Sequence, residues 1–189
     1  SEVAHEMGHA LGLQHSSDGS AEVYSNPWDA MSYCGFCRKQ DDYGPIRQHP
    51  AAYQKARLGW IPAAAKYTAL PGSTAQVTLE QLAQPQTSNY LMAVIPLPGD
   101  AGRYYTVEAR RRVGYDRNLP LDAVVIHRID PAGSPTAVVV AHGPVEGVLV
   151  NSGWIPGMVF ADAEHGVTVA VDAATDSGFV VTISNRPAG

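Results

Sequence analysis

From Lys66 onward the chain is built of short apolar or alternating runs, each bounded by Gly, Pro, Asp or Asn, and this spacing constrains the fold most. Between these runs no segment is patterned like a helix. Short strands at such intervals, with turn residues between them, are typical of antiparallel sandwiches. We therefore predict that residues 65–189 form a C-terminal antiparallel β-sandwich. The predicted strands are Gln76–Leu79, Tyr90–Ile95, Tyr104–Ala109, Ala123–Ile129, Ala137–Ala141, Val167–Val171 and Phe179–Ile183.

Residues 1–64 have a different pattern. Ser1–Leu11 is patterned as a helix, and Gly12 follows it at the position where a left-handed C-cap favours glycine. A polar loop is expected next, and Pro50–Leu58 is predicted to be a second short helix because Pro suits its first position. The predicted fold class is therefore α+β, with two regions, 1–64 and 65–189. Because the helical pattern begins at the first residue, we expect further sequence to precede it.

The stretch from His5 to His15 carries the clearest chemical signal. His5 and His9 lie one turn apart in the predicted helix, so their imidazoles share one face. Gly12 allows a sharp turn, which can return His15 as a third ligand. Glu6 stands beside these ligands, placed to act on water rather than to bind the metal. Three imidazoles bind Zn²⁺ and leave a fourth position open, as catalytic sites do, so the sequence predicts a catalytic Zn²⁺ site.

The string HEMGHALGLQH resembles the HExxHxxGxxH signature of the metzincin metallopeptidases at every fixed position. Further segments are most similar to the gametolysin-like and immune-inhibitor-like secreted peptidases. They are Tyr24–Met31, Ala52–Trp60, Tyr104–Arg110 and Gly114–Asp116. The resemblance implies a secreted, extracellular zinc endopeptidase that acts on protein or peptide substrates. Residues 1–64 would then be a truncated zinc-helix subdomain, without the twisted sheet that precedes this helix in the family.

The resemblance also implies roles for individual residues. Met31 would form the Met-turn, an apolar floor beneath the three histidines. Glu6 would act as the general base, taking a proton from the attacking water and passing it to the leaving amine. Tyr33 would donate a hydrogen bond to the oxyanion. A packing role at the edge of the core is an equally weighted alternative for Tyr33.

Cys34 and Cys37 have the spacing of a dithiol redox motif, but the βαβ context that such a motif needs is missing. If the protein is secreted, a structural disulfide between them is the favoured interpretation. Two alternative functions stay open. One is a redox protein that works through the two cysteines. The other is a catalytically incomplete zinc-binding fragment whose β-sandwich is a protein- or polysaccharide-binding module.

Composition removes other classes of function. A net charge of -5 argues against nucleic acid as a partner. No apolar run approaches the roughly 18 residues of a membrane span, and the sequence leaves the oligomeric state open. The basic run Arg110–Arg112 is predicted to lie on a solvated face. The remaining histidines are expected not to bind metal: His49, His127, His142 and His165.

Overall fold

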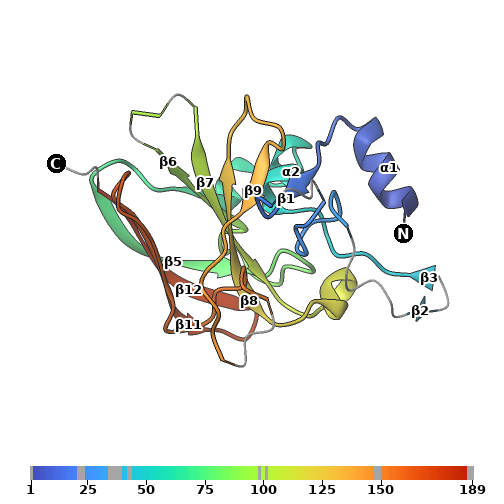
Figure 1. Ribbon diagram of the computed structural model, residues 1–189. Helices are drawn as coiled ribbons and strands as arrows, with labels where there is room; N and C mark the ends of the chain where they lie inside the picture. The colour runs from blue at the N-terminus through green and yellow to red at the C-terminus, as the bar shows by residue number, and fades with distance from the viewer. Residues whose placement is uncertain are drawn as a thin grey trace.

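The computed structural model describes residues 2–20, 24–33, 40–41, 44–97, 99–100, 102–146 and 150–186. Within this part of the chain the fold is mixed α+β, with two larger sheets and few helices (Figure 1). One sheet has six strands in the order β1-β9-β8-β7-β6-β4, and the other has four in the order β10-β11-β12-β5. A two-stranded sheet pairs β2 with β3.

The elements have the following bounds. The six-stranded sheet contains β1 (Ser16–Ser17), β4 (Lys66–Thr68), β6 (Met92–Pro96), β7 (Tyr104–Arg110), β8 (Ala123–Ile129) and β9 (Ala137–Val139). The four-stranded sheet contains β5 (Ser73–Glu80), β10 (Val159–Asp162), β11 (Val167–Ala174) and β12 (Gly178–Asn185). The small sheet contains β2 (Gln40–Asp41) and β3 (Gly44–Pro45). The helices are α1 (Glu2–Ala10), α2 (Ala52–Arg57) and the 3-10 segments η1 (Ala63–Ala65) and η2 (Gly114–Asn118).

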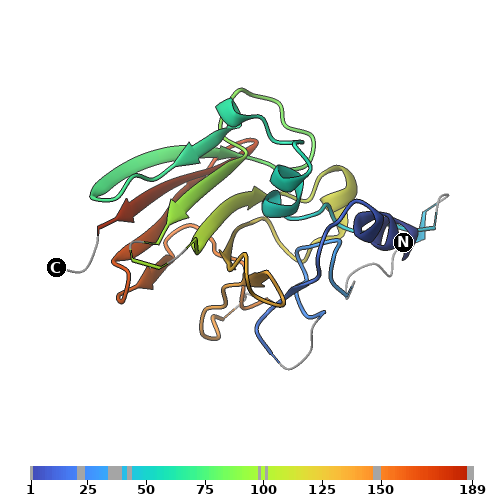
Figure 2. The same cartoon turned by 90° about the horizontal axis from the view of Figure 1, so that it is seen from above.

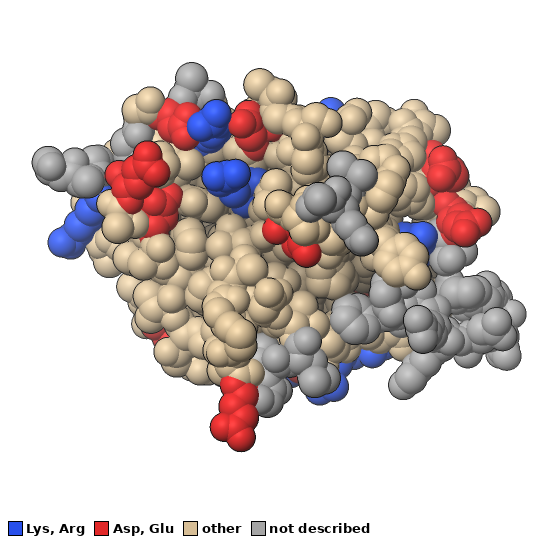
Figure 3. All heavy atoms as spheres, viewed as in Figure 1, with Lys and Arg blue, Asp and Glu red and all other residues tan. Residues whose placement is uncertain are grey.

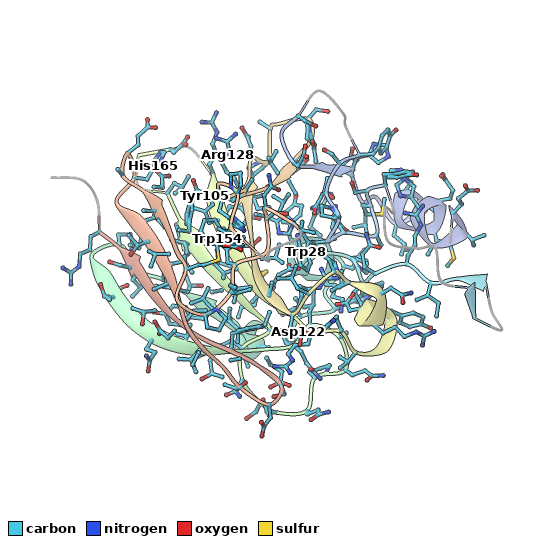
Figure 4. All side chains as sticks on the ribbon, turned by 60° about the horizontal axis from the view of Figure 1, so that its bottom comes forward. Trp28, Tyr105, Asp122, Arg128, Trp154 and His165 are labelled. Carbon is cyan, nitrogen blue, oxygen red and sulfur yellow. The ribbon has the colours of Figure 1, made fainter. Side chains whose placement is uncertain are left out.

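The main hydrophobic core lies between the two larger sheets. Val107 and Ile126 contribute to it from the six-stranded sheet, and Val169 and Val181 from the four-stranded sheet, all fully buried. Trp154 joins the same core from the segment before β10 (Figure 4). Alternating strand residues that bury one face in this way account for the pattern seen in the sequence. The arrangement is compatible with the predicted β-sandwich.

All seven predicted strands contain a strand in the structure, but the sandwich is not wholly antiparallel. Within residues 65–189 the pair β4–β6 is parallel, which corrects the prediction of a purely antiparallel sandwich, and β1 from the first region also pairs with β9 in parallel. Between β4 and β6 the chain passes through β5 in the other sheet, so no hairpin joins them and the antiparallel rule for hairpins does not apply. The short strands β1, β2, β3, β4 and β10 were not predicted, because two to four residues alone display no alternating pattern; β9 is as short, but it lies in the longer apolar run Ala137–Ala141.

Both predicted helices are present, within a few residues of their expected bounds. Figures 1 and 2 show α1 at the end of the molecule away from the four-stranded sheet, with α2 nearer the centre. Helix α2 contacts β7. Among the described residues, no helix has the length and apolar character that crossing a membrane requires.

The regions 1–64 and 65–189 share buried contacts across the predicted boundary. Trp28, labelled in Figure 4, is fully buried and belongs to a core cluster with Ala123 and Val125 of β8. Strand β1 adds to the edge of the six-stranded sheet, where Ser16 pairs with Ala137. The loop that follows α1 is therefore held directly by the sheet.

The prediction that Arg110 lies on a solvated face is wrong, because its side chain is fully buried. Its Nε and Nη2 donate to the two carboxylate oxygens of Asp116 at 2.8 and 2.7 Å, and Nη1 donates to Glu108 at 2.9 Å. Nη1 also donates to the carbonyl of Trp28, and Nη2 donates to that of His49. A buried guanidinium satisfied by two carboxylates is stable where an unpaired one would not be. Arg110 thus fixes the loop that carries the Met31 region against β7.

Candidate metal centre

Three histidine side chains from two segments meet at the C-terminal half of α1. The Nε2 atoms of His5 and His9 are 3.1 Å apart, as expected for residues four apart on one helix face. The Nε2 atoms of His9 and His15 are 2.8 Å apart. The ligand atoms of all three histidines lie within 4.8 Å of one another, so the structure brings the three predicted ligands together.

The turn after α1 explains how His15 reaches the helix. Gly12 has a φ of +82°, in the left-handed region that a side chain disfavours. The Leu13 N–H donates to the Gly8 carbonyl at 2.9 Å, which ends the helix and reverses the chain. Ser16 then enters β1, so His15 is held between a helix end and a sheet edge.

The outer nitrogens of two histidines are engaged with backbone carbonyls. His5 Nδ1 donates to the Ala30 carbonyl at 3.0 Å, and His9 Nδ1 donates to the Leu13 carbonyl at 3.0 Å. A neutral imidazole whose Nδ1 carries the proton has its lone pair on Nε2. The two Nε2 lone pairs therefore face each other at 3.1 Å without a proton between them. A cation between these lone pairs satisfies both, and Nδ1 bonds of this kind orient metal-binding histidines.

The donor set fits a transition metal. Tetrahedral coordination with bonds of about 2.0–2.1 Å separates the ligand nitrogens by roughly 3.3 Å, close to the spacing seen here. Burial, followed by the nearby His9 and His5, lowers the pKa of His15, which favours the neutral form that binds metal. Imidazole donors suit zinc but also copper, nickel and iron. Within the described part of the chain this is the one group of His, Cys, Asp or Glu that could hold a metal.

Met31 packs beneath the helix that carries the histidines. Gly8 is the buried residue of α1, and a Cβ at this position would overlap the Met31 sulfur. Met31 itself is 1% exposed. The neighbouring Ala30 carbonyl accepts the hydrogen bond of His5, so the same short loop supports the helix and orients a histidine.

An open cavity of about 700 Å³ lies beside His5 and contains both predicted catalytic residues, Glu6 and Tyr33. Tyr33 is 69% exposed, so its side chain is accessible from this cavity. Glu2 lines the same cavity one turn before Glu6. Figure 3 shows acidic side chains on the α1 side of the molecule.

Two residues that line this cavity, Tyr24 and Arg47, were not predicted from the sequence to belong to the site. The Tyr24 ring packs edge-on against the His15 ring, with centroids 4.3 Å apart. Arg47 Nη1 donates to the Ser32 carbonyl at 2.8 Å and to the Ala30 carbonyl at 3.4 Å, so it shares a carbonyl with His5. Neither residue has a fixed spacing from the histidines, so the only signal for Tyr24 is its place in the segment 24–31.

The four other histidines lie outside the three-histidine group. His127 is fully buried in β8, where its Nε2 accepts a hydrogen bond from Asn26 at 2.9 Å. His165 Nδ1 donates to Asp162 at 2.7 Å at the far end of the sandwich, near Tyr105 and Arg128 (Figure 4). The disulfide predicted between Cys34 and Cys37 falls outside the described residues, as do both cysteines.

The geometry thus provides three convergent imidazoles, a carboxylate that does not coordinate, and open space beside them. Such a group can hold a metal ion and present it to a ligand that enters the cavity. No protein-family model, curated protein or solved structure matches the chain.

Proposed function

We propose that the protein is a zinc-dependent endopeptidase of the metzincin type. The observation that carries this proposal is the convergence of three Nε2 atoms within 4.8 Å, with Glu6 next to the first ligand and lining the adjoining cavity. A structural metal site would use four protein ligands, whereas the described part of the chain brings three together here. We also propose that residues 1–64 are a truncated zinc-helix subdomain of the metzincin type.

His5, His9 and His15 would hold the zinc ion. When bound, zinc supplies a Lewis acid that activates water and polarises the scissile carbonyl. The Glu6 carboxylate takes the proton of the attacking water and delivers it to the leaving amine as the peptide C–N bond breaks. Tyr33 stands in the same cavity, where its phenol donates a hydrogen bond to the developing oxyanion.

The cavity also suits a polymeric substrate. About 700 Å³ accommodates several side chains of a peptide, and the cavity is open to solvent along α1. Secretion is proposed on the same family resemblance.

The test is the substitution Glu6→Gln, which keeps the size of the side chain but removes its basicity. We expect peptide hydrolysis to fall by about 10²–10⁴-fold while metal content is unchanged. Glu2→Gln is the matched control, because it removes the same charge one turn away and should cost less than about tenfold. Equal losses in the two variants, or full activity in Glu6→Gln, would contradict the proposal.

A further inference from the structure

We propose that Arg57 makes the cavity beside His15 a binding site for a carboxylate of the peptide substrate. The inference rests on the proposed endopeptidase function and adds to it a preference for acidic ligands. The cavity has a volume of about 470 Å³ and lies on the His15 side of the metal centre. It is separate from the cavity of Glu6 and Tyr33, which has neither His15 nor Arg57 in its lining.

Three segments form this second cavity. Gln14 and His15 come from the turn after α1, and Tyr53 and Arg57 come from α2. The loop between β8 and β9 completes it with two prolines, a glycine and the hydroxyl side chains Ser134 and Thr136. The wall is mostly polar, and its aromatic residues are Tyr53 and His15.

The charge of the lining points to an anion. Arg57 is the one formally charged side chain in the described lining, and there is no carboxylate among the lining residues. The cavity at Glu6 differs, because Glu2 and Glu6 both face it. The chain as a whole has a net charge of -5, whereas the formal charge of this cavity lining is positive. A guanidinium binds a carboxylate through two parallel N–H donors, which gives both affinity and orientation.

The helix that carries Arg57 is tied to the turn that carries His15. The Arg57 guanidinium lies 5.9 Å from the centroid of the Tyr53 ring, and Tyr53 is only 7% exposed. On the same helix, Gln54 Nε2 donates to the Gln14 carbonyl at 2.7 Å. Since Gln14 directly precedes His15, this bond ties α2 to the third metal ligand. The helix that presents the exposed Arg57 is thus anchored by buried neighbours, Tyr53 and Gln54.

The two cavities flank the three histidines. His5 and Glu6 border one, His15 borders the other, and the Nε2 atoms meet between them. A peptide that crosses the metal centre therefore extends toward Arg57 on the His15 side. The carboxylate that arrives there belongs either to an Asp or Glu side chain or to the C-terminus of the peptide.

The experiment uses three peptides of equal length that differ only in whether and where they carry a carboxylate. The first has one Glu, scanned through the sequence, and an amidated C-terminus; the second has Gln in place of Glu; the third is the Gln peptide with a free C-terminal carboxylate. Binding is measured by fluorescence anisotropy on the Glu6→Gln chain with equimolar zinc, so that cleavage does not interfere. We expect a carboxylate in the right position to strengthen binding by about tenfold or more. The Glu and free-terminus arms tell which source of carboxylate the site takes.

Variants of Arg57 then assign the effect. Arg57→Gln should abolish the preference, Arg57→Lys should retain part of it, and Arg57→Glu should reverse it toward peptides with Lys. Arg112→Gln is the matched control, since the Arg112 side chain is 56% exposed in an ion pair with Asp122 away from both cavities. Thermal unfolding of each variant shows that the fold is intact.

The outcomes separate the two proposals. Equal binding of the Glu and Gln peptides and of the free-terminus peptide, or a preference that persists in Arg57→Gln, would overturn the carboxylate site. If the unaltered chain still cleaves peptides in that case, the endopeptidase function stands. If acidic peptides bind through Arg57 but no peptide is cleaved with zinc present, the site stands and the endopeptidase function falls.

Discussion

The sulfur of Met31 lies against the backbone of Gly8, in the place that a Cβ on residue 8 would occupy. This contact puts the loop that orients His5 directly beneath the helix that carries His5 and His9. Any side chain at position 8 must therefore displace Met31 or lift the helix.

The first prediction concerns this contact. Gly8→Ala should lower the free energy of unfolding by about 1–3 kcal/mol, because the added methyl group overpacks a buried site. At an unhindered helical position the same change would instead stabilise by about 1 kcal/mol. Urea unfolding of the metal-free chain shows whether Gly8→Ala destabilises or stabilises the fold. Met31→Ala should relieve the overlap, so the two substitutions together should cost less than their sum. Additive effects would show that the contact is absent.

A second prediction compares two arginines of one basic run. Arg110→Met should destabilise the fold by about 3–5 kcal/mol, because it leaves Glu108 and Asp116 buried without their cation. Arg112→Gln should cost about 1 kcal/mol or less, since its ion pair with Asp122 is exposed. Chemical denaturation of both variants at neutral pH provides the comparison. Similar losses in the two would mean that Arg110 is not the buried anchor described here.

These two cases show what local sequence can and cannot reveal. Strands such as β8 and β12 were predictable because each is an apolar or alternating run bounded by turn residues, a pattern that is typical of strands. The convergence of His5, His9 and His15 was predictable because helix periodicity and Gly12 fix it locally. Arg110 was not, since its partners at Trp28 and His49 are distant in sequence and become neighbours only in the folded chain.

The residues around the site differ in the same way. Glu6 could be identified because it lies on the same helix as His5 and His9. Tyr24 and Arg57 lie on a loop and on α2, and only the fold brings them to the site. The roles of Glu6 and Tyr33 stay predictions, because geometry shows position and not turnover.

The third prediction concerns pH and His127. Burial lowers the pKa of this histidine to about 4 from an ordinary value of 6.5. The unfolded chain therefore binds more protons than the folded chain between pH 6.5 and 4. Stability is full above pH 6.5 and falls as pH drops toward 4, by up to about 3 kcal/mol from this group. Protonation would also remove the acceptor for Asn26.

The comparison is with His127→Gln, which does not titrate. The difference in unfolding free energy between the two proteins should shrink as pH falls from 6.5 to 4. A difference that stays constant over this range would show that His127 is not buried in its neutral form.

A fourth prediction separates two tyrosines near the metal centre. Tyr33→Phe should lower kcat more than it raises KM, because the phenol acts only as the oxyanion develops. The loss should be smaller than for Glu6→Gln, since the metal stabilises the same charge. Tyr24→Phe keeps the ring that packs on His15 and should leave kcat nearly unchanged. Steady-state kinetics on one peptide tests all three, and an effect on Tyr24 alone would reassign the hydroxyl donor.

Elemental analysis of the purified chain after dialysis against a weak chelator is the direct test of the three-histidine zinc site. We expect about one zinc ion per chain in the unaltered protein. We also expect loss of most of that zinc in His9→Ala, because His9 Nε2 lies between the other two ligands. His142→Ala, on the sandwich and outside the three-histidine group, should keep the full amount. Stoichiometric zinc in His9→Ala, or no zinc in the unaltered chain, would contradict the three-histidine site.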